Sequence, residues 1–197
     1  MEGSSMELNT RHPDVSINEI FINRWSPRSF KKTPIAAEDI SRLFEAARWA
    51  PSGSNNQPWR FIYASSGKKR EKLNAVLMDS NKIWASEAPL LILVFCLTST
   101  SDGREIRTAQ FDTGAAWMSL AIQARYMGLY THAMGGIHRD KAIEFMGKQK
   151  SKYESICAIA VGYKDNKDRL PDSLKSREIM SQRMLVSEFV FNGEIDC

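Results

Sequence analysis

Cysteines are few in this sequence, and long apolar runs are absent. Its 197 residues contain Cys96, Cys157 and Cys197, whose spacing fits neither a disulfide framework nor a metal-binding motif. The longest apolar run covers ten residues, 88–97, whereas a membrane-spanning helix needs about 18. The first residues also lack the basic and apolar regions of a signal peptide. We therefore expect a cytoplasmic protein with free thiols and no membrane contact.

The familiar catalytic and nucleotide-binding motifs are missing too. No Gly-x-Gly-x-x-Gly, P-loop, His-Glu-x-x-His, Cys-x-x-Cys or Gly-x-Ser-x-Gly sequence occurs. His12, His132 and His138 show no ligand spacing, and we expect each to be a structural or solvated side chain. These absences argue against metal hydrolases and against hydrolases with a catalytic triad, and we expect no metal site.

An excess of one charge is also slight. The 27 Lys and Arg residues and the 23 Asp and Glu residues leave a formal charge of +4. Both signs are mixed along the last third of the chain, which is typical of a solvated surface and not of a strip that follows nucleic-acid phosphates. We therefore expect no nucleic-acid partner.

The composition is that of a globular domain. Hydrophobic residues make up 43% of the chain and charged residues 25%. A chain of this length buries roughly 70% of its extended surface, which is enough for a core without disulfides or a metal. The polar start predicts a flexible arm over 1–15, and we expect residues 16–197 to form a single domain.

Hydrophobic spacing predicts helices mixed with strands. A capping box opens the first helix at Ser16. The predicted helices cover 16–24, 37–49, 66–78, 104–128 and 139–146. The predicted strands cover 59–64, 89–97 and 155–161. The stretch 115–124 is apolar nearly all round, so we expect it to be central or to lie at an interface. This mixture fits an α/β or α+β sheet covered by helices.

Several polar loops are candidate ligand sites. Arg24, Ser26 and Arg28 offer two guanidinium groups and a hydroxyl that suit a phosphate, although a surface helix end explains them equally well. The loop 51–58 is rich in small polar residues that let a ligand approach the backbone, but an ordinary connection is the simpler interpretation. The two glycines at 135–136 allow either a close approach of the backbone to a ligand or an ordinary turn.

Together and in this order, these segments resemble the nitroreductase family of flavoenzymes. The resemblance extends over about 20–191. Its motifs are Arg24-x-Ser26-x-Arg28-x-Phe30, Ala50-Pro51-Ser52-Gly53-Ser54-Asn55-x-Gln57-Pro58-Trp59-x-Phe61, Asp112-x-Gly114-Ala115-Ala116, Gly128-Leu129, Gly135-Gly136 and Arg183-x-Leu185-x-x-Glu188. The string that begins at Pro51 and ends at Trp59 is the most specific.

The resemblance implies a fold and an activity. The fold would be an α+β, FMN-binding sandwich with a central, mostly antiparallel sheet flanked by helices, assembled as an intertwined homodimer with FMN at the subunit interface. The activity would be an oxidoreductase that takes hydride from NADH or NADPH and reduces nitroaromatic, quinone or similar small electron acceptors by a ping-pong mechanism. The alternatives are a specialised FMN reductase of the family, such as a dehalogenase or enoyl-type reductase, and a non-catalytic flavin-binding protein.

The resemblance also assigns the phosphate end of the cofactor. Arg24, Trp25, Ser26 and Arg28 match the segment that holds the FMN phosphate and ribityl chain, with Arg28 reaching toward the N1/O2 edge. Arg183 matches a C-terminal arginine at the phosphate. A guanidinium beside N1 would stabilise the negative charge of reduced flavin.

Other segments are assigned to the flavin ring. Five loop residues match the loop that the partner subunit lays along the flavin: Pro51, Ser52, Gly53, Ser54 and Asn55. Three residues match the segment whose backbone N–H faces N5: Met134, Gly135 and Gly136. Asn81 matches a residue at the pyrimidine end. None of these side chains is an obvious acid or base, so no catalytic residue is assigned.

Two positions depart from the family pattern. Some members carry a lysine two residues before the C-terminal arginine, where this chain has Ser181. Some carry an acidic residue where this chain has Gly135. The first departure weakens the expected hold on the phosphate, and the second changes the polarity beside N5 and with it the choice of substrate.

Overall fold

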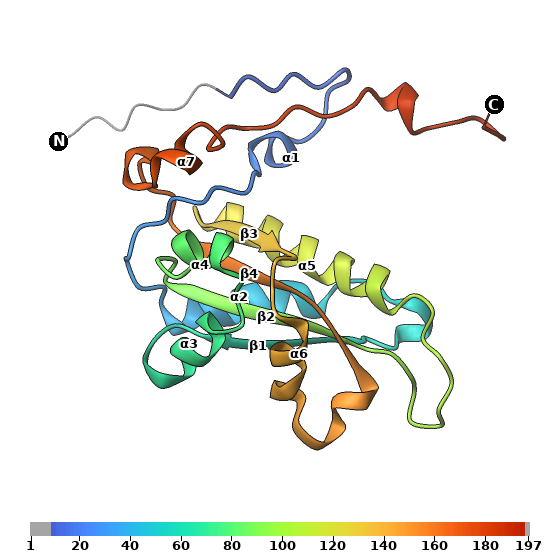
Figure 1. Ribbon diagram of the computed structural model, residues 1–197. Coiled ribbons are helices and arrows are strands. Elements are labelled where there is room, and N and C mark those ends of the chain that lie inside the picture. Colours follow the sequence, from blue (N-terminus) through green and yellow to red (C-terminus); the bar gives the residue numbers. More distant parts are fainter. Residues whose placement is uncertain (1–8, 196–197) are drawn as a thin grey trace.

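The computed structural model describes residues 9–195 (Figure 1). The described chain forms a four-stranded sheet in the order β1-β2-β4-β3, in which every neighbouring pair is antiparallel. The strands are β1 (Trp59–Ala64), β2 (Leu90–Leu97), β3 (Tyr130–Met134) and β4 (Tyr153–Gly162). This antiparallel sheet, with helices packed on it, confirms the α+β class.

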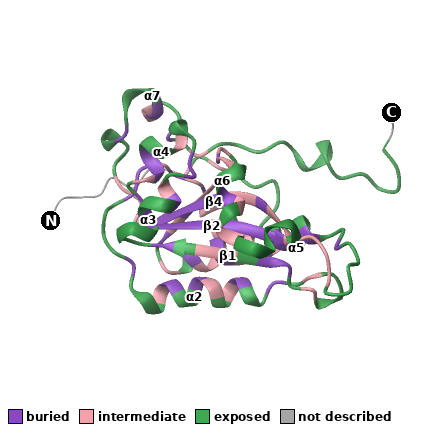
Figure 2. Cartoon of the chain, turned by 60° about the horizontal axis from the view of Figure 1, so that its bottom comes forward, coloured by how far each residue is buried: buried purple, intermediate pink, exposed green. Residues whose placement is uncertain are grey.

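Helices cover both faces of the sheet (Figures 1 and 2). One face packs against α2 (Ala37–Arg48) and α5 (Ala109–Tyr126). The other packs against α3 (Gly67–Asn74), α4 (Asp79–Ala85) and α6 (Arg139–Ile143). The remaining helical elements are short: α1 (Glu19–Asn23), α7 (Asp172–Lys175) and the 3₁₀ turns Gly53–Asn55, Glu144–Lys152, Lys167–Arg169 and Val186–Glu188.

Strand β2 lies at the centre of the core because both of its faces are covered. Its side chains alternate between the two layers. Leu91 and Leu93 pack in the cluster with α3 and α4, whereas Leu90 and Ile92 pack in the cluster with α2 and α5. All four are completely buried. This double burial explains why the strand is a continuous apolar run and not an alternating one.

Two predicted helices begin later than expected. The first is capped by Asn18 and not by Ser16, because the Asn18 side chain accepts a hydrogen bond from the Ile20 N–H at 3.0 Å. The helix predicted over 104–128 begins at Ala109. The chain before it folds back on itself through a bridge between Ser99 and Glu105, with a left-handed glycine between them.

Other differences come from contacts between distant segments. The helix predicted over 66–78 ends at Asn74, because the next residues pair with the chain after β3 through a bridge between Leu77 and Ile137. Helix α4 and strand β3 were not predicted. The turn predicted at 134–136 therefore starts only after Met134, which ends β3. The helix predicted over 139–146 gives way to a 3₁₀ turn after Ile143.

The N-terminal segment, from residue 9 on, runs alongside the stretch that follows α7, above α1 in Figure 1. The Gln182 amide donates a hydrogen bond to the Thr10 carbonyl at 3.2 Å. Of the arm predicted over 1–15, residues 1–8 lie outside the described residues, as does Cys197. The tail 181–195 is exposed along its length although it is rich in apolar side chains (Figure 2). Within 9–195, no helix has both the length and the apolar character needed to cross a membrane.

Candidate functional site

A cavity of about 280 Å³ opens between the two chain ends, α1 and β3. Its lining includes five arginines from three segments: Arg11, Arg24, Arg28, Arg177 and Arg183. Trp25, Ser26, His132, Ile179 and Ser181 complete it. The cavity is therefore strongly cationic, although the chain as a whole carries little net charge.

The arginines of this cavity repel one another. Burial, followed by the positive charge of Arg183, lowers the pKa of Arg24. Burial, then Arg183 and Arg24, lowers the pKa of Arg11 in the same way. Guanidinium groups remain protonated in proteins, so the repulsion stays in the structure unless an anion enters. A phosphate suits such a site, because the planar guanidinium fork donates two parallel hydrogen bonds to its oxygens.

A buried carboxylate fixes the segment that carries Arg28. Glu178 is fully buried and accepts hydrogen bonds from the backbone N–H of Arg28, at 2.8 and 3.0 Å, and of Ser29, at 3.0 Å. Its carboxylate also lies 3.9 Å from the Arg28 guanidinium. Sequence reasoning missed Glu178, because the polar stretch around it looked like a solvated surface.

The floor of the cavity is aromatic and neutral. Trp25 is almost completely buried, packs edge-on against Tyr130 with ring centres 6.3 Å apart, and leaves its indole N–H without a hydrogen-bond partner. His132 Nδ1 lies 2.9 Å from the Pro27 carbonyl, so Nδ1 carries the proton and donates. Burial lowers the pKa of His132 to about 4. The imidazole is therefore neutral near pH 7 and leaves the cationic character to the arginines.

The loop 51–57 lies elsewhere, at the start of α5. The Gly53 N–H donates to the buried Asp112 carboxylate at 3.1 Å, and the Thr108 hydroxyl donates to the same carboxylate at 2.8 Å. Ser54, Asn55 and Gln57 have φ values of 50°, 55° and 47°, in the left-handed region that favours glycine. The loop therefore holds strained backbone at an exposed position.

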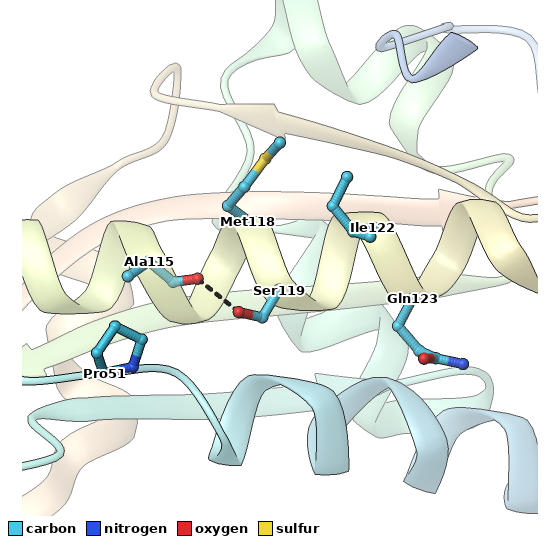
Figure 3. A pocket seen from close by; sticks show the side chains of 6 residues that line it. All are labelled: Pro51, Ala115, Met118, Ser119, Ile122 and Gln123. Carbon is cyan, nitrogen blue, oxygen red and sulfur yellow. Dashed lines mark hydrogen bonds between the residues drawn. The ribbon is translucent and has the colours of Figure 1, made fainter. Parts of the chain in front are cut away.

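Beside this loop, an open apolar groove of about 480 Å³ runs along α5 (Figure 3). Pro51 lines one end, and the other lining residues come from α5: Ala115, Met118, Ser119, Ile122 and Gln123. Figure 3 shows Met118 and Ile122 standing on the same side of the helix. The opposite side of α5 packs on the sheet through Leu120. Helix α5 is thus apolar both toward the core and toward this groove, as its sequence predicts.

The turn after β3 lies against α4. Asn81 Nδ2 donates to the Gly136 carbonyl at 3.0 Å, and the Met78 N–H donates to the same oxygen at 3.1 Å. A Cβ on Gly136 would overlap the Asn81 amide, so any larger residue there would displace the Asn81 side chain from its present position. Nothing crowds Gly135.

Comparison with known proteins identifies the family. The family model described as "Nitroreductase family" matches residues 22–84 and 79–163. The chain belongs to the nitroreductase family. It is 27% identical over 181 residues to the Bacillus subtilis (strain 168) protein YdgI, which is named for an NAD(P)H nitroreductase activity. That match covers 73% of this chain and 86% of YdgI.

Two solved structures show how far the fold of this nitroreductase-family chain extends. An oxidoreductase described as containing FMN is 35% identical, with a TM-score of 0.90 over 97% of this chain and 98% of the other. An enone reductase of gut-bacterial fatty-acid saturation, CLA-ER, is 19% identical, with a TM-score of 0.67 over 82% of this chain and 96% of the other. The second likeness concerns the fold alone.

The residues predicted for one site form three groups in this nitroreductase-family protomer. Five of them share the cationic cavity: Arg24, Trp25, Ser26, Arg28 and Arg183. Asn81, on α4, and Gly136, after β3, form a second group next to Met134 and Gly135. The loop from Pro51 to Asn55, including Ser52, Gly53 and Ser54, is the third, and none of its residues lines the cavity. Arg11 and Glu178 belong with the first group and were not predicted.

Proposed function

We propose that this chain is an FMN-dependent oxidoreductase that takes hydride from NADH or NADPH and reduces nitroaromatic, quinone or similar small acceptors in a ping-pong cycle. The observation that carries the proposal is the cavity with five converging arginines. Burial and then mutual repulsion lower the pKa values of Arg11 and Arg24, and both costs favour the entry of a multiply charged anion such as the FMN phosphate.

The donor set fits FMN from its phosphate toward its ring. Arg24 and Arg183 would hold the phosphate and Ser26 the ribityl chain, with Arg28 toward the N1/O2 edge, and the buried indole N–H of Trp25 is a donor without a partner in the protein. Gly136 keeps the backbone close to Asn81 on the ring side. When bound, FMN supplies the two-electron chemistry that connects the hydride donor to the acceptor.

The described residues of the proposed site would supply orientation and charge, and none of them is an obvious acid or base. Among the proposed site residues, Arg28 places a fixed positive charge beside the flavin edge where reduction adds negative charge. Burial raises the pKa of Cys96 to about 11 and that of Cys157 to about 12, so neither thiol is a nucleophile near neutral pH. We expect water to supply the proton. These free thiols also fit a reducing, cytoplasmic compartment.

A homodimer would bring the third group to the site. In one protomer the loop 51–55 lies away from the arginine cavity, beside the apolar groove of α5. Its left-handed residues are exposed, and so are the apolar side chains of the tail 184–191. We propose that a second copy covers the groove and receives the loop, so that each FMN lies between two subunits.

The absorbance spectrum of the purified protein tests the cofactor. We expect a yellow protein that releases about one FMN per subunit and is bleached rapidly by NADH or NADPH. A flavin that stays oxidised on mixing would leave a flavin-binding protein without turnover. A colourless protein that takes up no added FMN would refute the proposal. Steady-state rates with nitroaromatic, quinone and enone acceptors then distinguish a nitroreductase from a specialised relative.

Arg24→Ala tests the phosphate assignment. Removing one charge-assisted contact costs about 1.5–3 kcal/mol, so FMN should bind roughly ten- to a hundredfold more weakly. Fluorescence titration of the apoprotein with FMN measures the change. Arg42→Ala, on the exposed face of α2, is the matched control and should leave the affinity unchanged. Equal FMN affinity of Arg24→Ala and the wild type would contradict the assignment.

A further inference from the structure

Arg11 reaches the cavity from outside the family motifs. It lies in the N-terminal segment, eleven residues before Ile22, where the match to the family model begins. Its guanidinium nevertheless lines the same cavity as Arg24, Arg28 and Arg183. None of the sequence patterns that suggest the cofactor site includes it.

The Arg11 side chain ties together the segments that carry two other arginines. Its Nη1 donates to the carbonyl oxygens of Ile22, at 3.0 Å, and of Arg24, at 2.9 Å, where α1 ends. Its Nε donates to the carbonyl of Ser181 at 2.9 Å. Ser181 is also a partner of Arg183, whose Nη1 donates to the serine hydroxyl at 2.9 Å. One guanidinium thus bridges the end of α1 and the tail.

Local contacts hold the N-terminal segment in this place. The Arg11 N–H donates to the Asn9 side chain at 3.0 Å, and the Asn9 amide donates to Asn23 at 2.8 Å. The Gln182 amide adds a hydrogen bond to the Thr10 carbonyl. The segment is therefore attached to both elements that Arg11 joins, which gives its side chain a defined position at the cavity.

The contacts of Arg11 do not neutralise its charge. Its three hydrogen-bond acceptors are carbonyl oxygens, and the charges of Arg183 and Arg24, which repel it, have the same sign. Carbonyl oxygens can stabilise a guanidinium, but they leave its net charge available to a ligand. Nη2 forms no described hydrogen bond, so donors remain for an anion placed between the three arginines.

We propose that Arg11 is a further phosphate-binding and positioning residue of the cofactor site, and that the N-terminal segment closes the phosphate end of the cavity. The inference rests on the proposed function, because the phosphate in question is that of FMN. Arg11 adds a positive charge beside Ser181, whose own side chain is uncharged. It also ties the backbone at Arg24 to the backbone at Ser181, two residues before Arg183.

Riboflavin and FMN together test this role, because the two ligands differ only in the phosphate. We expect Arg11→Met to bind FMN about tenfold or more weakly than the wild type, and to bind riboflavin within about twofold of it. Arg11→Lys keeps the charge but lacks the wide guanidinium fork that bridges the three carbonyls. Its FMN affinity should therefore fall between that of Arg11→Met and that of the wild type. Arg42→Met is the matched control, because Arg42 pairs with exposed acids on α2.

Each outcome of the two titrations decides the inference. A lower preference for FMN over riboflavin in Arg11→Met, with an unchanged melting temperature of the apoprotein, supports it. An unchanged preference in a variant that still binds FMN overturns it and leaves the proposed function intact. Equal weakening of both ligands with a lower melting temperature makes Arg11 a structural link only, which also overturns it. A wild type that binds no FMN refutes the proposed function and this inference together.

Discussion

Replacing Glu178 with glutamine tests whether one buried carboxylate holds the cofactor segment in place. Glu178 lies in the 177–183 segment and contacts the chain about 150 residues earlier, at Arg28 and Ser29. It accepts two backbone N–H groups in a fully buried environment and lies 3.9 Å from the Arg28 guanidinium. The substitution keeps the size of the side chain and removes its charge, so the change isolates the electrostatic contribution.

The magnitude follows from these contacts. Glutamine Oε1 can still accept from both N–H groups, but each bond changes from charge-assisted to neutral, which costs about 1 kcal/mol. The new amide replaces the oxygen that lay 3.0 Å from the Arg28 N–H, so two donors face each other. The ion pair with Arg28, whose side chain is 18% exposed, is lost as well. Together these changes should lower the free energy of unfolding by about 2–4 kcal/mol.

Chemical and thermal unfolding measure this loss. A domain of this size loses roughly 2–4 °C of melting temperature per kcal/mol, so Glu178→Gln should melt about 5–15 °C lower. Glu144→Gln removes an exposed carboxylate paired with Lys150 and should change the free energy of unfolding by less than about 0.5 kcal/mol. A Glu178→Gln protein as stable as this control would refute the reasoning, because the carboxylate would then contribute no net stability.

Two further perturbations test other parts of the fold. Burial depresses the pKa of His132 from 6.5 to about 4, so on acidification the unfolded chain takes up the proton before the folded chain does. The contribution of the neutral imidazole to the free energy of unfolding is therefore complete above pH 6.5. About 3 kcal/mol of it is lost as the pH falls to 4. Urea unfolding at several pH values should show this slope, and His132→Gln should remove it, whereas an equal slope in both proteins would contradict it. A Cβ on Gly162, at the end of β4, would lie 2.6 Å from Pro89 Cδ and 3.1 Å from the Phe30 ring. Gly162→Ala should therefore cost about 1–3 kcal/mol in thermal unfolding, and a cost near zero would mean that the rigid proline ring gives way.

Elements with strong local signals could be predicted from the sequence. Strand β1 has the predicted bounds, and β2 and α2 differ from theirs by one residue at one end, because apolar spacing and flanking prolines define them locally. Strand β3 has no such signal. Its five residues include Thr131 and His132, and they become a strand because β4 offers a free edge for pairing. The break between α3 and α4 likewise depends on the distant bridge at Leu77.

The candidate site likewise has a part with a local sequence signal and a part that depends on contacts between distant segments. Arg24, Ser26 and Arg28 stand within five residues of one another, so their common role is visible in the sequence, and the cavity includes all three. Arg11 and Glu178 lie at opposite ends of the chain and act on this segment only after the ends meet. A single sequence gives no sign of such a meeting, because each residue by itself looks like a solvated charge.

One protomer carries two unfavourable features that the proposed assembly would relieve. The arginines of the cavity repel one another, and the loop at Ser54, Asn55 and Gln57 holds left-handed backbone that costs on the order of 1–3 kcal/mol per residue. FMN would neutralise the repulsion, and the binding energy of a second copy would offset the cost of the left-handed backbone. FMN and the second copy would both bind the folded chain in preference to the unfolded one, so each would add stability by mass action. The melting temperature should therefore rise with FMN concentration and, separately, with protein concentration, and a rise with FMN alone would contradict the dimer while it left the cofactor site intact.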